Sequence, residues 1–261
     1  MKTKQMLQET TDRQLMEMAD AHCHLDMMQE LDLSKWLEHG VRTIITNGVD
    51  TRSNIRNMEI SDDKHIFPML GIDPEHSNIG EEDLEFNIKM IRHNSSRIVG
   101  IGEIGLDYGH IKEKVNISTQ KSVFERFLDL ASELRLPVSI HSRDALEDIL
   151  HILEEKRMEN VHIHFFEGNV QQAKAVEKKG YMISVPPIHS SKRSKVIKEI
   201  AIDNIMPESD APAVGASPMD VYKSIEIVAE AKRIDVRRAA DILTQNTKRF
   251  FRIKSTKFMR Y

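Results

Sequence analysis

The chain has 261 residues, with 37 Lys and Arg against 41 Asp and Glu, so its formal net charge is −4. That balance excludes a protein that coats polyanions through a generally basic surface. Hydrophobic residues make up 40% of the chain, enough for one large domain with a sizeable core. The single cysteine, Cys23, excludes an internal disulfide and a CxxC zinc ribbon, so a metal site must use His and carboxylate ligands.

Polar residues interrupt the N-terminal segment, and no later stretch approaches the roughly 18 apolar residues of a membrane span. We therefore expect a cytoplasmic protein that has no membrane partner. Residues 1–18 are interpreted as an N-terminal extension and residues 19–261 as a single domain. The oligomeric state stays open, and a monomer is compatible with the sequence.

Eight short apolar or β-branched runs predict strands at residues 18–22, 43–46, 66–70, 98–101, 137–140, 161–165, 181–185 and 202–206. Helical periodicity is clearest over residues 118–134 and recurs at 82–92, 145–155, 170–179, 192–200 and 219–231. A final helix is expected from an N-cap at Asp235 toward Phe250. The alternation predicts an α/β protein, and about 240 residues in eight even units favour a closed (β/α)8 TIM-like barrel over an open doubly wound sheet.

Histidines and acidic residues gather where the predicted strands end. On the first strand, two histidines stand two residues apart, so both imidazoles project to one face. The fourth strand is followed by a glutamate among glycines, and the fifth, sixth and eighth lead to further candidates. Because the C-terminal ends of barrel strands form one face, we expect these six side chains to meet. They are His22, His24, Glu103, His141, His164 and Asp210.

Three neighbouring residues, Asp144, His162 and Cys23, have structural explanations. Asp144 is expected to cap the next helix, and His162, deeper in its strand, to be a hydrogen-bonded core histidine. Glu208 falls on the same strand face as Asp210. Cys23 points to the opposite face from the two histidines beside it, so we expect it to pack in the core.

Six ligands exceed what one tetrahedral zinc ion with an open position needs, so they favour two divalent ions. A water bridging two such ions becomes hydroxide near neutral pH, which indicates a hydrolase. Mixed imidazole and carboxylate ligation suits transition metals better than Ca²⁺, and Mg²⁺ where water completes its shell. Mg, Mn and Zn all remain candidates.

In order and spacing, the strings DAHCHLD, GEIGLDY, PVSIHSRDA, HFFEG, ESDAP and QNTKRFF resemble the motifs of the TatD family of metal-dependent hydrolases over about residues 19–251. The resemblance implies a barrel of the amidohydrolase type, a divalent metal centre and phosphodiester hydrolysis on DNA, often from the 3′ end. A single-stranded or frayed DNA substrate is therefore the expected partner.

The resemblance also implies roles for individual residues. His22, His24 and Asp210 would hold one ion, His141 and His164 the second, and Glu103 would bridge both. Asp210 would act as the catalytic base. Arg143 and Asp107 lie in family motifs and would line the substrate pocket. A salt bridge to Glu103 or Asp144 is the alternative role for Arg143.

Several positions depart from the family pattern. Asp73 and Glu75 stand in GIDPEH where the family usually has two histidines, and Glu167 adds a further acid near the predicted centre. Ala213 and Gly109 replace aromatic residues. Added negative charge would repel phosphate, so these changes weaken the nucleic-acid interpretation.

Three functions are compatible with these residues. A nuclease would need cations and aromatic residues at the barrel mouth. Loop residues that could supply them are Tyr108, His110, Lys112, Lys114, Lys192, Arg193 and Lys195, although a solvated surface is the favoured explanation of these charges. The acidic changes favour an ester, amide or lactone hydrolase, including one that cuts an aminoacyl ester on tRNA. A noncatalytic metal-binding scaffold would be expected to lack a ligand, and all six are present.

Overall fold

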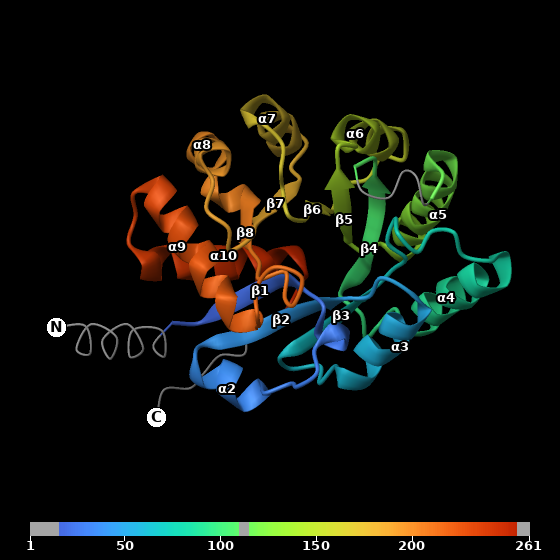
Figure 1. Cartoon of the computed structure of the whole chain (residues 1–261), viewed down its shortest axis with the longest axis horizontal. Coiled ribbons are helices and arrows are strands. Elements are labelled where there is room, and N and C mark those ends of the chain that lie inside the picture. Colours follow the sequence, from blue (N-terminus) through green and yellow to red (C-terminus); the bar gives the residue numbers. More distant parts are fainter. Residues whose placement is uncertain (1–15, 110–114, 255–261) are drawn as a thin grey trace.

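The computed structural model describes residues 16–109 and 115–254. Eight parallel strands form one sheet in the order β1-β2-β3-β4-β5-β6-β7-β8, and the helices lie outside it (Figure 1). The strands are β1 (Met18–Cys23), β2 (Val41–Asn47), β3 (Ile66–Leu70), β4 (Gly100–Asp107), β5 (Val138–Arg143), β6 (Val161–Ile163), β7 (Met182–Val185) and β8 (Ile205–Pro207).

The helices follow the strands in alternation. They are α2 (Leu33–Glu38), α3 (Thr51–Ile60), α4 (Glu81–His93), α5 (Ile117–Leu134), α6 (Leu146–Glu155), α7 (Val170–Lys178), α8 (Ser191–Glu199), α9 (Val221–Lys232) and α10 (Val236–Phe250). Short 3-10 turns η1 (Leu25–Met27), η2 (Ile202–Asn204) and η3 (Pro218–Asp220) complete the chain. No helix within the described ranges is long and apolar enough to cross a membrane.

The last strand meets the first just beyond the end of β8. The Asp210 N–H donates to the His22 carbonyl at 3.0 Å, and the His24 N–H donates to the Ala211 carbonyl at 2.7 Å. These bonds confirm the predicted (β/α)8 arrangement as a nearly closed barrel. They also bring the segment after β8 against two predicted ligands, His22 in β1 and His24 just after it.

Helix α5 shows how the outer layer is attached. Its buried positions include Val123, Phe124, Phe127, Leu128 and Ala131, which follow the predicted spacing of three and four residues. This apolar stripe packs against β4, so the amphipathic pattern places the helix on the barrel. Asp235 caps α10 as expected, accepting from the backbone N–H groups of Arg237 and Arg238.

Several predicted strands differ in extent, among them the fourth and the eighth. The fourth strand was expected to end at Ile101 but continues to Asp107, because its pairing with β5 extends to the register Asp107↔Arg143. The eighth was expected from residue 202, but residues 202–204 form η2, and β8 begins at Ile205. The barrel therefore carries some site residues inside strands.

The predicted cap of α6 is wrong. Ala145, not Asp144, occupies the N-cap position, and no side-chain hydrogen bond caps the helix. Asp144 directly follows β5 and adopts φ of 53°. The left-handed conformation suits Asp, because its short polar side chain tolerates that region. The predicted boundary between extension and domain adjoins β1, which begins at Met18, and most of the extension lies outside the described residues.

Candidate metal centre

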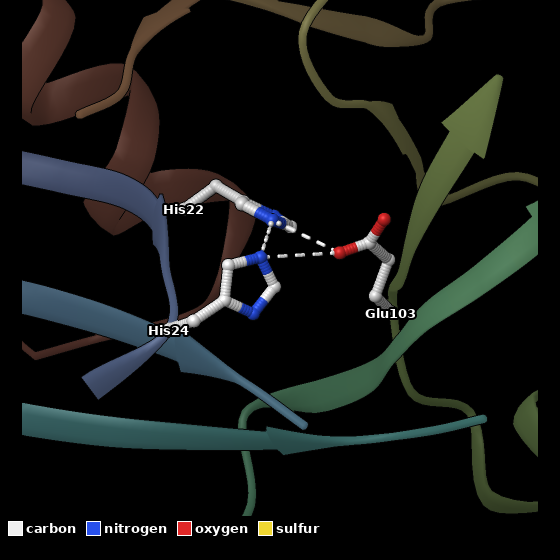
Figure 2. A group of neighbouring side chains, drawn as sticks. All are labelled: His22, His24 and Glu103. Atoms are coloured by element: carbon white, nitrogen blue, oxygen red, sulfur yellow. Dashed lines mark hydrogen bonds and ion pairs between the residues drawn. The ribbon is translucent and has the colours of Figure 1, made fainter. Parts of the chain in front are cut away.

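All six predicted ligands meet at the C-terminal ends of the strands. Strands β1, β4 and β5 contribute side chains from within the strand, His24 and His164 directly follow β1 and β6, and Asp210 lies three residues beyond the end of β8. Glu103 was expected just past the fourth strand, but it lies inside β4 because that strand is longer than predicted. Its carboxylate faces His22 and His24 across the barrel (Figure 2).

A first group of donor atoms forms a small triangle. The Nε2 atoms of His22 and His24 are 3.2 Å apart, and Glu103 Oε2 lies 3.3 Å from the first and 3.4 Å from the second (Figure 2). Asp210 Oδ1 lies 3.6 Å from His24 Nε2 and 4.0 Å from His22 Nε2. The side chains predicted to hold the first ion, those of His22, His24 and Asp210, therefore lie close together, and Glu103 Oε2 lies beside them.

The other Glu103 oxygen belongs to a second group. Oε1 lies 2.9 Å from His141 Nδ1 and 2.9 Å from His164 Nε2, and these two nitrogens are 3.4 Å apart. Each oxygen of one carboxylate therefore faces a different pair of histidines. That division is what a bridging carboxylate between two ions requires.

The donor atoms fit a divalent ion. Around a tetrahedral ion with bonds of about 2.05 Å, ligand atoms lie about 3.3 Å apart, and the first triangle has edges of 3.2 to 3.4 Å. His24 Nδ1 lies 3.0 Å from the Asn47 carbonyl, to which it donates a proton, so its Nε2 presents a lone pair to the centre. The residues present therefore fit a metal centre.

The electrostatic environment also favours a cation. Burial opposes the charged form of Glu103, but the charge of His164 and hydrogen bonds with His141 and His164 hold its pKa well below the usual value. Burial lowers the pKa of His24, yet Asp210 and Glu103 raise it to about 9. Carboxylates in this buried space stabilise positive charge, whether protons or metal ions carry it.

Glu208 is a site residue that the sequence interpretation did not assign. It is fully buried, and it accepts hydrogen bonds from Ser184 Oγ at 2.6 Å and from the Phe165 N–H at 2.9 Å. Its Oε2 also lies 3.8 Å from His164 Nδ1, a buried nitrogen with no hydrogen bond. The signal was a carboxylate next to an apolar strand end, where burial without partners is costly.

The two predicted substrate residues have different environments. Asp107 is buried, and its Oδ2 lies 3.1 Å from His141 Nε2, where it fixes the orientation of that ring. Arg143 Nη1 is 3.9 Å from the same Asp107 oxygen, so its nearest carboxylate is neither Glu103 nor Asp144. Arg143 lines a cavity of about 280 Å³ over the metal centre.

Two of the acidic departures reach that cavity. Asp73 and Glu167 line it together with Ala213. Asp73 pairs with His76 Nδ1 at 2.7 Å, although burial raises the pKa of its carboxyl group. Glu75 is exposed. The cavity is therefore lined by the cation of Arg143 and by two acidic residues, Asp73 and Glu167, that the family pattern lacks.

The predicted cations at the mouth are mostly engaged. Lys192 donates to the Glu167 carbonyl at 2.5 Å, and Arg193 donates to the Ile188 carbonyl and stacks over Phe165. Tyr108 donates to Asp148 at 2.7 Å, and Lys195 is exposed on α8. His110, Lys112 and Lys114 lie outside the described residues. Cys23 is buried within the core, as expected.

A (β/α)8 barrel with His and carboxylate side chains clustered at its C-terminal face is typical of barrel metal-dependent hydrolases. The family model described as TatD related DNase matches residues 19–252. The chain therefore belongs to the TatD family of metal-dependent hydrolases.

Individual relatives are consistent with membership of this family. The chain is 33% identical to the uncharacterized metal-dependent hydrolase YabD of Bacillus subtilis, over 90% of this chain and 98% of that protein. It is 29% identical to the human deoxyribonuclease TATDN3, over 90% of this chain and 94% of that protein. The crystal structure of YjjV, a TatD homologue from Escherichia coli, matches with a TM-score of 0.83 and 24% identity, covering 91% of this chain and 98% of that one.

Proposed function

We propose that the protein is a deoxyribonuclease that uses two divalent ions, Mg, Mn or Zn, to cleave single-stranded or frayed DNA from the 3′ end. The observation that carries the proposal is the division of the Glu103 carboxylate between two histidine pairs, with Asp210 beside the first. The name of the human relative, a deoxyribonuclease, supports the substrate.

The chain's residues have distinct roles in this proposal. His22, His24 and Asp210 would hold one ion and His141 and His164 the other, with Glu103 shared. When bound, the ions supply a hydroxide near neutral pH and offset negative charge on the phosphoryl oxygens.

Three further side chains would act around the reacting phosphate. Asp210, held at φ of 47° after β8, accepts the proton of the attacking water. Asp107 holds the ring of His141 in place. Arg143, lining the cavity, pairs with a phosphate oxygen.

The shape of the mouth supports an extended substrate. The central cavity shares Met27 and Val49 with a hollow of about 570 Å³ beyond β1 and β2, which Arg52 and Arg56 line. On the other side it adjoins a hollow of about 550 Å³ at the N-terminal ends of α6, α7 and α8. A strand longer than one nucleotide would thus find room on either side of the centre, where acidic side chains such as Asp50 and Glu147 lie beside the cations.

The test is cleavage of 5′-labelled single-stranded DNA with Mg²⁺ or Mn²⁺. Wild type and an Asp203→Asn variant, which changes an exposed carboxylate away from the centre, are expected to shorten the strand stepwise from its 3′ end. Asp210→Asn is expected to slow cleavage by about 10³-fold. Release of the labelled 5′ nucleotide first would contradict the polarity. Intact DNA with wild type that holds metal by elemental analysis would exclude the nuclease.

A second candidate is an ester or amide hydrolase, including an aminoacyl-tRNA deacylase. Asp73 and Glu167 favour it, because they place negative charge in the cavity where a phosphodiester would bind. Aminoacyl-tRNA and simple aryl esters should be assayed beside the DNA with the same variants. Deacylation that Asp210→Asn abolishes, with DNA left intact, would establish this alternative.

We also propose that the protein is located in the cytoplasm and is a monomer. A single buried cysteine is compatible with a reducing compartment. Scattering measurements of molar mass in solution would test the monomer.

A further inference from the structure

A line of buried polar side chains runs through the barrel interior to the metal centre. It links Glu208, Ser184, His162, Ser139 and His22, which belong to or follow five different strands and are all fully buried. Ser139 and His162 are directly paired in register between β5 and β6. The interior of such barrels is usually filled by branched apolar residues, so four consecutive polar partners here need an explanation.

Hydrogen-bond chemistry sets the proton positions at the Glu208 end. The Ser184 hydroxyl has one proton, which it donates to Glu208 Oε2 at 2.6 Å. Ser184 Oγ must then accept at its second short contact, 2.7 Å from His162 Nε2. The proton of His162 therefore lies on Nε2.

The remaining links pass this order to the metal centre. His162 lies in a dry interior, with Phe250 and Phe251 at ring distances of 6.1 and 6.2 Å, where a charged imidazolium would be costly. As a neutral ring its Nδ1 accepts, so Ser139, at 3.1 Å, donates to it. Ser139 Oγ then accepts from His22 Nδ1 at 3.3 Å, which leaves the His22 Nε2 lone pair facing Glu103 and His24.

We propose that Ser139, His162, Ser184 and Glu208 form a relay that fixes the tautomer of His22 in its metal-binding form. These four are positioning residues, because they act on the centre through His22. The relay does for His22 what the Asn47 carbonyl does for His24. It rests on the metal-binding role of His22 in the proposed function, and it does not depend on whether the substrate is DNA.

The relay makes a prediction for the unmodified, metal-free protein. Two-bond ¹H–¹⁵N correlation spectra of histidine-labelled wild type distinguish the two neutral tautomers of each ring. We expect His22 to carry its proton on Nδ1 and His162 on Nε2. A His22 ring with its proton on Nε2 would overturn the proposal without any substitution.

Substitution then tests the consequence for metal binding. Ser139→Ala and Ser184→Ala are expected to give a mixture of His22 tautomers and to raise the zinc dissociation constant, measured by chelator competition, by about 10- to 100-fold. Ser224→Ala is the matched control, since Ser224 is also fully buried but bonds the Val185 carbonyl outside the relay. Zinc affinity of Ser139→Ala equal to that of the control would contradict the relay.

The two proposals fail differently. DNA left intact by a protein with the expected His22 tautomer would remove the nuclease and leave the relay standing. DNA cleavage by a wild type with the opposite tautomer would do the reverse.

Discussion

Two parts of the barrel interior are built from opposite kinds of residue. The metal centre combines imidazoles and carboxylates, most of them buried. Elsewhere in the same barrel, a compact apolar cluster contains Ala21, Ile45, Met69, Met182, Met206 and Phe251. Adjacent residues can therefore belong to different regions: Ala21 lies in the apolar cluster, and His22 lies in the candidate metal centre. Burying polar groups costs free energy, and burying apolar surface supplies it, so we expect the first region to govern activity and the second to govern stability.

The largest expected effect is at Glu103. Glu103→Gln keeps the shape but removes the shared negative charge, so each histidine pair loses its anionic partner. Activity on the preferred substrate is expected to fall by about 10³-fold or more. The amount of bound metal, measured by elemental analysis, should also fall.

The control is Glu155→Gln at the exposed end of α6, which should retain full activity. Circular dichroism should show that Glu103→Gln remains folded. A Glu103→Gln variant with normal metal content and a normal rate would contradict the expectation that the polar region governs activity.

The converse substitution is in the apolar cluster. Met69→Ala removes a fully buried side chain and leaves a cavity, so the free energy of unfolding should fall by about 2–5 kcal/mol. Activity per folded molecule should stay unchanged. Met69→Leu, which nearly conserves volume, should cost less than about 1.5 kcal/mol in the same urea titrations. A large loss of turnover in folded Met69→Ala would show that the two regions are coupled.

Helix α5, which was predicted, and helix α3, which was not, differ in their buried residues. Helix α5 carries its buried face in Val, Phe and Leu, so its period is visible. Helix α3 was not predicted, because its buried residues Ser53, Asn54 and Asn57 are polar. Asn54, for example, bonds both backbone groups of Gly71. A helix that packs through hydrogen bonds gives no hydrophobic signal, since its partners lie in distant segments.

The candidate site divides in the same way. Its six proposed ligands could be found because short motifs place each at a strand end, and a barrel brings strand ends together. The partners of those ligands could not be found. The Asp107 contact with His141 and the Glu208 contact with Ser184 depend on β4–β5 pairing and on side chains 24 or more residues apart. Pairings of that kind follow from register, which the sequence does not display.

A smaller effect concerns Asp20, a fully buried carboxyl group on β1 that accepts hydrogen bonds from Ser209. Burial, opposed by hydrogen bonds from Ser209, raises the pKa of Asp20 to about 8. The folded state then holds a proton that the unfolded chain releases above about pH 4, so this group's contribution to stability falls as pH rises from about 4 to 8.

The measurement is urea unfolding with a chelator at pH 5 and pH 7.5. Wild type should lose up to roughly 3 kcal/mol more than Asp20→Asn over this interval, because Asn stays neutral. Equal losses in the two proteins would show that Asp20 is already ionised in the folded state.

The smallest expected effect is at Arg143, which lies on the rim where the polar region meets solvent. Its side chain is 36% exposed and 3.9 Å from Asp107, so water and that carboxylate already satisfy part of its charge. Arg143→Gln should therefore raise KM for a phosphodiester by about 10-fold and change kcat little. Arg143→Lys should recover part of the loss, since it restores the charge without the paired donors. If instead kcat falls and KM stays constant, Arg143 acts on the transition state, and the catalytic region extends to the rim.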